Sequence, residues 1–105
     1  MKRVVIIGSG NLAEALARAV AKSDLELVQI FARNPERARV VAELAATDWA
    51  THSEMLRQDA DIYLIAVSDK AVEQVAATLP IPESAAVAHT AGSVPVTAIL
   101  SLIHI

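Results

Sequence analysis

The chain has 105 residues, of which 54% are hydrophobic and 20% are charged, and it carries a formal net charge of −3 with no cysteine. This length suits one domain, and the lack of cysteine excludes a disulfide framework and thiolate chemistry. The negative charge argues against a nucleic-acid partner or an anionic membrane surface, and no apolar run approaches the roughly 20 residues that span a bilayer. Because the first residues do not resemble a secretory leader, we expect a cytoplasmic protein.

The first predicted element is a strand from Arg3 to Ile7, because its continuous apolar run suits a parallel strand buried on both faces. A helix follows as far as Lys22, with apolar residues at helical spacing. We expect its buried stripe to consist of Leu12, Ala15, Leu16, Ala19 and Val20. The apolar period therefore changes from strand to helix across Gly8 to Ala13.

The junction between this strand and this helix reads G-x-G-x-x-A, from Gly8 through Gly10 to Ala13. Glycines let the backbone approach a ligand closely, and the first turn of a helix presents unpaired N–H groups at the positive end of its dipole. A small residue such as Ala13 suffices where the helix packs on the strand. The motif predicts a pyrophosphate site, with an ordinary glycine turn as the alternative. Its residues are Gly8, Ser9, Gly10, Asn11 and Leu12.

A second strand is expected from Leu25 to Phe31, followed by a helix that has Asn34 as its N-cap and Pro35 in its first position. A weaker third strand at Thr47 to Ala50 and a short helix at Ser53 to Gln58 come next. The inward face of the second long helix is expected to carry Ala38, Val41, Ala42 and Ala45.

The second half of the chain continues the same alternation of strands and helices. Its expected elements are a strand at Ile62 to Val67, a helix at Lys70 to Leu79 after a Ser68-Asp69 cap, a strand at Ala85 to Ala88 and a helix beginning at Pro95. This order predicts an α/β fold, a doubly wound parallel sheet with right-handed crossovers. Ligands of such sheets bind at the carboxyl ends of the strands. Four loops would meet there: Gly8 to Asn11, Ala32 to Asn34, Val67 to Lys70 and His89 to Ser93.

The end of the second strand indicates which dinucleotide binds. A strand-end carboxylate normally receives the ribose 2′-hydroxyl of NAD, whereas arginine accommodates the 2′-phosphate of NADP. Arg33 stands at this place, with Asn34 beside it and Arg37 one helical turn further on. We therefore predict NADP as the cofactor, held by these three residues. The alternative is a solvated face on which Arg37 and Arg39 pair with nearby glutamates, Glu36 or Glu43.

The two later loops supply further candidate contacts to the cofactor. Val67 and Ser68 would face the middle of the dinucleotide, and capping is the structural alternative for Ser68. His89 would stand near the nicotinamide and orient its carboxamide or pass a proton, unless it is packed in the fold. Thr90 and Ala91 would give backbone contacts. The sequence identifies no catalytic residue and no metal-ligand spacing.

Together these segments resemble a known group of proteins. They are V-V-I-I-G-S-G-N-L-A from Val4, the Ala-Arg-Asn-Pro-Glu-Arg-Ala segment from Ala32, Ala66 to Lys70, and His-Thr-Ala-Gly-Ser from His89. The chain resembles the Rossmann-like NADP-binding N-terminal domain of pyrroline-5-carboxylate reductase and of deazaflavin-dependent NADP reductases. It is most similar to the uncharacterised Rossmann-like oxidoreductases in which a helical C-terminal domain follows.

The resemblance implies hydride transfer with NADPH to a small-molecule substrate, a small imine or carbonyl compound. In these relatives the helical domain supplies most of the substrate pocket and the homodimer contacts, so we expect this chain to be a truncated and inactive fragment. The expected Rossmann-like domain covers residues 1–99. Residues 100–105 match the translated end sequence of a transposon used to fragment DNA for sequencing, so we expect a non-native tail.

Two other functions remain open at this point. A Rossmann module can bind NAD(P) as a sensor or regulator without turnover, and fold alone does not separate that role from catalysis. A flavodoxin-like signalling domain is disfavoured, because a receiver would carry clustered carboxylates at its strand ends. The leading interpretation is the cofactor-binding domain of an NADP-dependent oxidoreductase.

Overall fold

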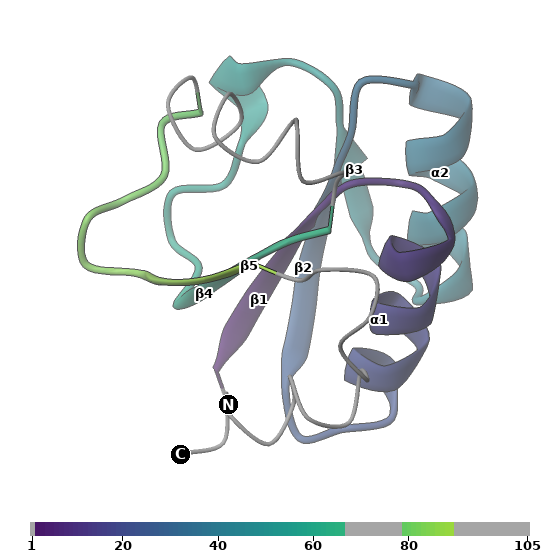
Figure 1. The fold of residues 1–105 in the computed structure, drawn as a ribbon, viewed down its shortest axis with the longest axis horizontal. Coiled ribbons are helices and arrows are strands. Elements are labelled where there is room, and N and C mark those ends of the chain that lie inside the picture. Colours follow the sequence, from purple (N-terminus) through teal and green to yellow (C-terminus); the bar gives the residue numbers. More distant parts are fainter. Residues whose placement is uncertain (1, 67–78, 90–105) are drawn as a thin grey trace.

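The computed structural model describes residues 2–66 and 79–89. Their strands form a parallel sheet in the order β3-β2-β1-β4-β5 (Figure 1). The strands are β1 (Arg3–Ile7), β2 (Glu26–Phe31), β3 (Asp48–Ala50), β4 (Ile62–Ile65) and β5 (Ala86–His89). The predicted doubly wound Rossmann-like sheet is therefore confirmed, with each of its strands within two residues of the expected bounds.

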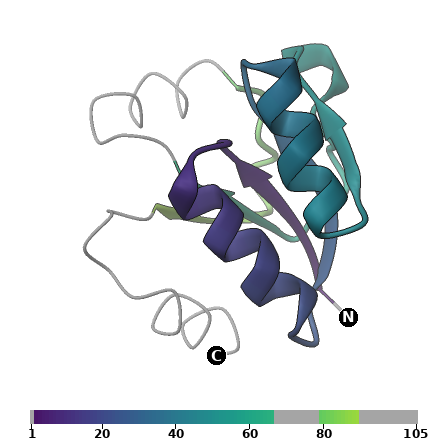
Figure 2. The ribbon, with the colours of Figure 1, turned by 90° about the vertical axis from the view of Figure 1, so that its right-hand side faces the viewer.

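Two helices, α1 (Asn11–Ala21) and α2 (Pro35–Leu44), lie side by side on one face of the sheet (Figure 2). The predicted N-cap of α2 is confirmed, because the Asn34 side chain accepts hydrogen bonds from the N–H groups of Glu36 and Arg37. Its inward face is also confirmed: Ala38, Val41 and Ala42 are buried, and Ala45 is partly buried.

The central strands are buried on both faces, as their continuous apolar runs predict. Alternate residues point to opposite sides of a strand, so β1 sends Val4 and Ile6 toward the two helices and Val5 and Ile7 to the other face. On that other face Tyr63 is fully buried, and its hydroxyl donates a hydrogen bond to the carbonyl of Arg57. This two-sided burial fixes the register of the strands that carry the loops.

The stripe predicted for α1 is partly wrong. The buried residues are Ala13, Leu16, Ala17 and Val20, whereas Ala15 is exposed and Ala19 is half-buried. The observed set follows a regular helical stripe that starts at Ala13, the residue that the glycine loop brings onto the sheet. Alanine fits buried and exposed positions almost equally well, so the sequence pattern did not distinguish these two faces.

The predicted helix at Ser53 to Gln58 is a single 3-10 turn, η1 (Ser53–Met55). Its backbone becomes extended at Leu56. The buried Gln29 side chain then takes the polar groups that a longer helix would use: it donates to the Met55 carbonyl and accepts from the Arg57 N–H. The predicted helices at Lys70 to Leu79 and from Pro95 lie outside the described residues, apart from Leu79.

Candidate functional site

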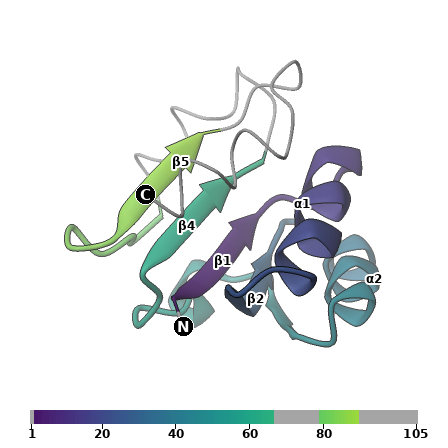
Figure 3. The same cartoon turned by 90° about the horizontal axis from the view of Figure 1, so that it is seen from below.

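The loops that follow β1 and β2 meet at the carboxyl edge of the sheet. Strand β1 lies between β2 and β4: strands β2 and β3 lie on one side of it and β4 and β5 on the other, so the strand order reverses at β1 (Figure 3). In doubly wound sheets this reversal opens the crevice in which ligands bind. The Gly8 to Asn11 loop stands directly at it.

Gly8 is required by the packing of the fold. Its φ is +135°, and a Cβ built on it would lie 2.3 Å from the carbonyl oxygen of Ala66 at the end of β4. Its N–H also donates to the carbonyl of Phe31 at 2.7 Å. Because a side chain here would collide with backbone, Gly8 is what allows the chain to turn tightly between β2 and β4.

Gly10 has a different reason to be glycine. Among residues 2–66 and 79–89, apart from its chain neighbours, nothing lies within 4 Å of the position that its Cβ would take, and its φ of −81° suits any residue. It is the N-cap of α1 and supplies no side-chain cap, so the first turn of α1 keeps N–H groups available to a ligand. Fully buried Ala13 seats that turn on the sheet. Open space beside an uncapped helix N-terminus fits the pyrophosphate of a dinucleotide.

Asn34 and Arg33 follow β2 and face solvent. The Asn34 Oδ1 is engaged as the α2 cap, at 3.0 Å from the N–H of Glu36. Arg33 is exposed, and within residues 2–66 and 79–89 it makes no hydrogen bond or ion pair. Its guanidinium is therefore available to a phosphate, whereas the Asn34 cap leaves only its amide N–H₂ to donate.

Arg37 reaches back to the glycine loop. Its Nε and Nη2 donate to the Ser9 carbonyl at 3.1 and 2.8 Å, and Nη2 lies 3.5 Å from a carboxylate oxygen of Glu14. The alternative predicted for these arginines was pairing with glutamates on a solvated face. It holds for Arg39, which lies 3.9 Å from Glu43. Arg37, a residue of α2, instead binds the glycine loop of the candidate site.

Glu14 is a member of the site that the sequence analysis did not select. It sits in the first turn of α1, and its carboxylate accepts a hydrogen bond from Arg18 at 2.9 Å. This bond, with a smaller contribution from Arg37, lowers the pKa of Glu14 below its usual value. The i,i+4 spacing of Glu14 and Arg18 was a signal for this pair, whereas no local pattern links Glu14 with Arg37.

The remaining predicted contacts are placed only in part. Val67, Ser68, Thr90 and Ala91 lie outside the described residues, as do residues 100–105. His89 is the last residue of β5 and pairs with Ile65, the last residue of β4. The backbone of His89 therefore lies at the carboxyl edge of the sheet. Its proposed role at the nicotinamide stays a prediction.

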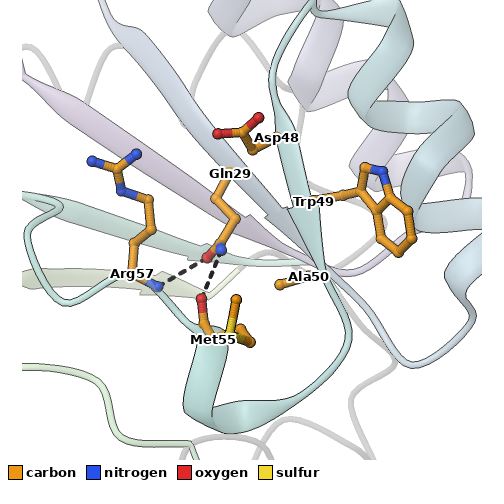
Figure 4. A pocket seen from close by; sticks show the side chains of 6 residues that line it. All are labelled: Gln29, Asp48, Trp49, Ala50, Met55 and Arg57. Atoms are coloured by element: carbon orange, nitrogen blue, oxygen red, sulfur yellow. Dashed lines mark hydrogen bonds between the residues drawn. The ribbon is translucent and has the colours of Figure 1, made fainter.

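A hollow of about 390 Å³ lies at the β3 edge of the sheet. Figure 4 shows Gln29 pointing from β2 toward Met55 and Arg57, and Trp49 pointing away from them. None of the lining residues belongs to the loops at the carboxyl edge: they are Gln29, Asp48, Trp49, Ala50, Met55 and Arg57. Gln29 is only 5% exposed and its amide is bonded to backbone, so its polar groups serve the fold.

Residues 2–66 and 79–89 contain neither a candidate metal site nor a membrane-spanning helix. No group of three or more His, Cys, Asp or Glu residues there could hold a metal ion. No helix there is both long enough and apolar enough to cross a membrane.

Comparisons with known proteins show the family to which this chain belongs. The family model described as coenzyme F420-dependent NADP oxidoreductase matches residues 3–91. A Bacteroides fragilis structure named as an NADP oxidoreductase is 31% identical over 90% of this chain, with a TM-score of 0.79. A UDP-N-acetylglucosamine 3-dehydrogenase from Acidithiobacillus ferrooxidans is 26% identical over 72%, with a TM-score of 0.65.

A 1-pyrroline-5-carboxylate reductase from Streptococcus pyogenes shares the fold, with 21% identity over 95% of this chain and a TM-score of 0.70. The chain spans only 37%, 25% and 38% of the lengths of these three proteins, respectively. No curated protein sequence matches it significantly.

Proposed function

We infer the function of this chain from its family, because it belongs to the coenzyme F420-dependent NADP oxidoreductases. We propose that it is the cofactor-binding domain of an enzyme that transfers hydride between NADPH and a small imine or carbonyl compound. The cofactor supplies the hydride when it is bound, and a polarised C=N or C=O bond is a suitable acceptor. The chain is an NADP-binding domain of an oxidoreductase family, and the proposal adds the class of substrate.

One observation supports this proposal above the others: the open approach to Gly10 at the uncapped start of α1, beside the exposed Arg33. The backbone of Gly8 to Leu12 would receive the pyrophosphate, and Arg33 would fork two hydrogen bonds to the 2′-phosphate. Asn34 could add a donor while it caps α2. Val67 and Ser68 would face the middle of the dinucleotide, and His89, Thr90 and Ala91 would contact the nicotinamide.

The substrate pocket is proposed to lie mostly outside this chain. The three solved structures named above are longer than this chain, which spans 37% of the Bacteroides fragilis protein. We propose that a helical domain completes the pocket and forms a homodimer in the whole protein. This chain would then bind NADPH without turning it over by itself.

The binding half of the proposal is tested by titrating the purified chain with NADPH and NADH in a calorimeter. Arg33 donates to a group that only NADPH carries, so we expect NADPH to bind at least about tenfold more tightly. Arg33→Ala should reduce NADPH affinity to the NADH level, and Arg39→Ala, which removes the same charge elsewhere, should change neither. Equal affinities in the folded wild-type chain would contradict the assignment of Arg33.

The catalytic half needs the protein encoded by the whole gene, recovered from an independent clone. Its NADPH oxidation would be followed with cyclic imines, small aldehydes and ketones, and coenzyme F420. Turnover of an imine or carbonyl compound supports the proposal, and reduction of F420 alone would replace the proposed substrate class. Tight NADPH binding with no turnover of any acceptor would favour the sensor alternative.

A further inference from the structure

Two arginines follow β2, but the structure gives them different surroundings. Arg33 is exposed and makes no bond within the described residues. Arg37 donates twice to the Ser9 carbonyl, at 3.1 and 2.8 Å, and lies 3.5 Å from Glu14. An arginine that only bound a ligand phosphate would need no contact with the Ser9 carbonyl or with Glu14, so these contacts point to a second role for Arg37.

The contact between Arg37 and the Ser9 carbonyl affects the orientation of the next N–H group. It shares one planar trans peptide with the N–H of Gly10, so the two groups point in opposite directions. By holding the carbonyl toward α2, Arg37 directs the Gly10 N–H away from α2. A peptide beside glycine can otherwise turn at little steric cost, because glycine has no side chain. In the described part of the chain, neighbours in sequence aside, no atom lies within 4 Å of the Gly10 Cβ position. Arg37 therefore supplies a restraint on the orientation of this peptide.

Arg37 also acts on the charge of the loop. The Glu14 carboxylate lies in the first turn of α1, where it would oppose an approaching phosphate. Arg18 meets one of its oxygens at 2.9 Å and Arg37 meets the other at 3.5 Å. The two guanidinium groups compensate the carboxylate, so the start of α1 remains favourable to an anion.

We propose that Arg37 is a positioning residue for the pyrophosphate loop, and that discrimination between NADPH and NADH is left to Arg33. This inference rests on the proposed cofactor site. It changes what a substitution does, because both dinucleotides carry the pyrophosphate whereas only NADPH carries the 2′-phosphate.

The test compares NADPH and NADH affinities in the wild-type chain and in Arg37→Ala. We expect both affinities to fall by the same factor, about tenfold, so that their ratio stays constant. Arg33→Ala should change the ratio, and Arg39→Ala is the matched control for loss of one positive charge on α2. A loss confined to NADPH, or no loss for either dinucleotide, would overturn the proposal.

Arg37→Lys is a milder variant that is less prone to a folding defect. It also distinguishes positioning of the Ser9 peptide from a direct contact with the 2′-phosphate. An ammonium can neutralise Glu14 but cannot make both bonds to Ser9, so the two affinities should again fall equally, by less than in Arg37→Ala. If Arg37→Lys restored the binding of NADPH alone, residue 37 would contact the 2′-phosphate, and the proposal would be overturned. Circular dichroism and thermal unfolding establish that each variant is folded.

A ligand-free measurement keeps this inference separate from the proposed function. The chain has 3 glycines, so the amide resonance of Gly10 in a ¹⁵N NMR spectrum is simple to assign. Arg37→Ala should shift it strongly and Arg39→Ala should not. An unmoved Gly10 resonance overturns the positioning role, whereas failure of the wild-type chain to bind either dinucleotide overturns the proposed function instead.

Discussion

At the scale of single residues, the two glycines of the loop have separable roles. Gly8→Ala would place a methyl group 2.3 Å from the Ala66 carbonyl oxygen at a φ of +135°, so we expect a loss of roughly 2 to 4 kcal/mol in the free energy of unfolding. Gly10→Ala meets open space, so its loss should stay below about 1 kcal/mol while NADPH affinity falls. Urea unfolding and titration of both variants test this. Equal destabilisation by the two substitutions would contradict it.

Asp59 gives a residue-scale prediction of pH dependence. Its hydrogen bond with Arg57 lowers the pKa of Asp59 from 3.8 to about 2, and Arg3 also contacts it at 2.9 Å. A carboxylate with a lowered pKa stabilises the fold above its unfolded pKa, and this contribution is lost as pH falls from 3.8 through about 2. Asp59→Asn should therefore be less stable than wild type at neutral pH, and the difference should shrink across that window. Unfolding at a series of pH values measures it, and a constant difference would contradict the assignment.

At the scale of elements, the start of α2 depends on Asn34. Its Oδ1 accepts from the N–H groups of Glu36 at 3.0 Å and Arg37 at 3.3 Å. Asn34→Ala should cost about 1 kcal/mol of the free energy of unfolding, and Asn34→Asp, which keeps the cap, should cost much less. Denaturant unfolding of the pair decides this. If both variants lost the same stability, the amide rather than the cap would be responsible.

The segment between β3 and β4 depends on Gln29 in a similar way. Gln29 bonds the Met55 carbonyl at 2.9 Å and the Arg57 N–H at 3.0 Å, and it is 5% exposed. Gln29→Leu keeps most of the volume but leaves two backbone groups without this partner, so we expect a loss of roughly 2 to 3 kcal/mol. Gln58→Leu is the control: this residue is exposed and donates one hydrogen bond, to the Leu56 carbonyl at 3.2 Å, so its replacement should cost much less. Amide hydrogen exchange should show faster opening at Arg57 in Gln29→Leu, and unchanged exchange there would contradict the role.

These elements also show what the sequence could predict. Strands β1 and β4 carry long apolar runs, and Asn34-Pro35 is a strong local start signal, so the sheet and the start of α2 were predictable. The helix predicted after Ser53 was wrong because its end is set by Gln29, a residue of a different strand that bonds the Met55 carbonyl and the Arg57 N–H. The contact of Arg37 with Ser9 spans 28 positions in the chain, and no local period encodes such a partner.

At the scale of the whole molecule, β1, α1, β2 and α2 are linked into one structural unit, because the residues of the glycine loop are bonded to neighbouring elements. The Gly8 N–H donates to Phe31, and Arg37 of α2 holds Ser9. A ligand held by this unit should therefore stabilise the domain as a whole rather than one loop. A dinucleotide at one hundred times its dissociation constant adds about 2.7 kcal/mol of stability.

For a chain of 105 residues that gain should raise the melting temperature by roughly 10 to 20 °C with NADPH, since each kcal/mol shifts it by about 4 to 8 °C. NADH at the same concentration should raise it much less. A chain ended at Ile99 is the matched control, because we propose that residues 100–105 contribute nothing to the domain. It should melt at the same temperature and respond equally to NADPH. A lower melting point or a weaker response of the shorter chain would assign those six residues to the domain, and equal shifts with both dinucleotides would contradict the NADPH preference.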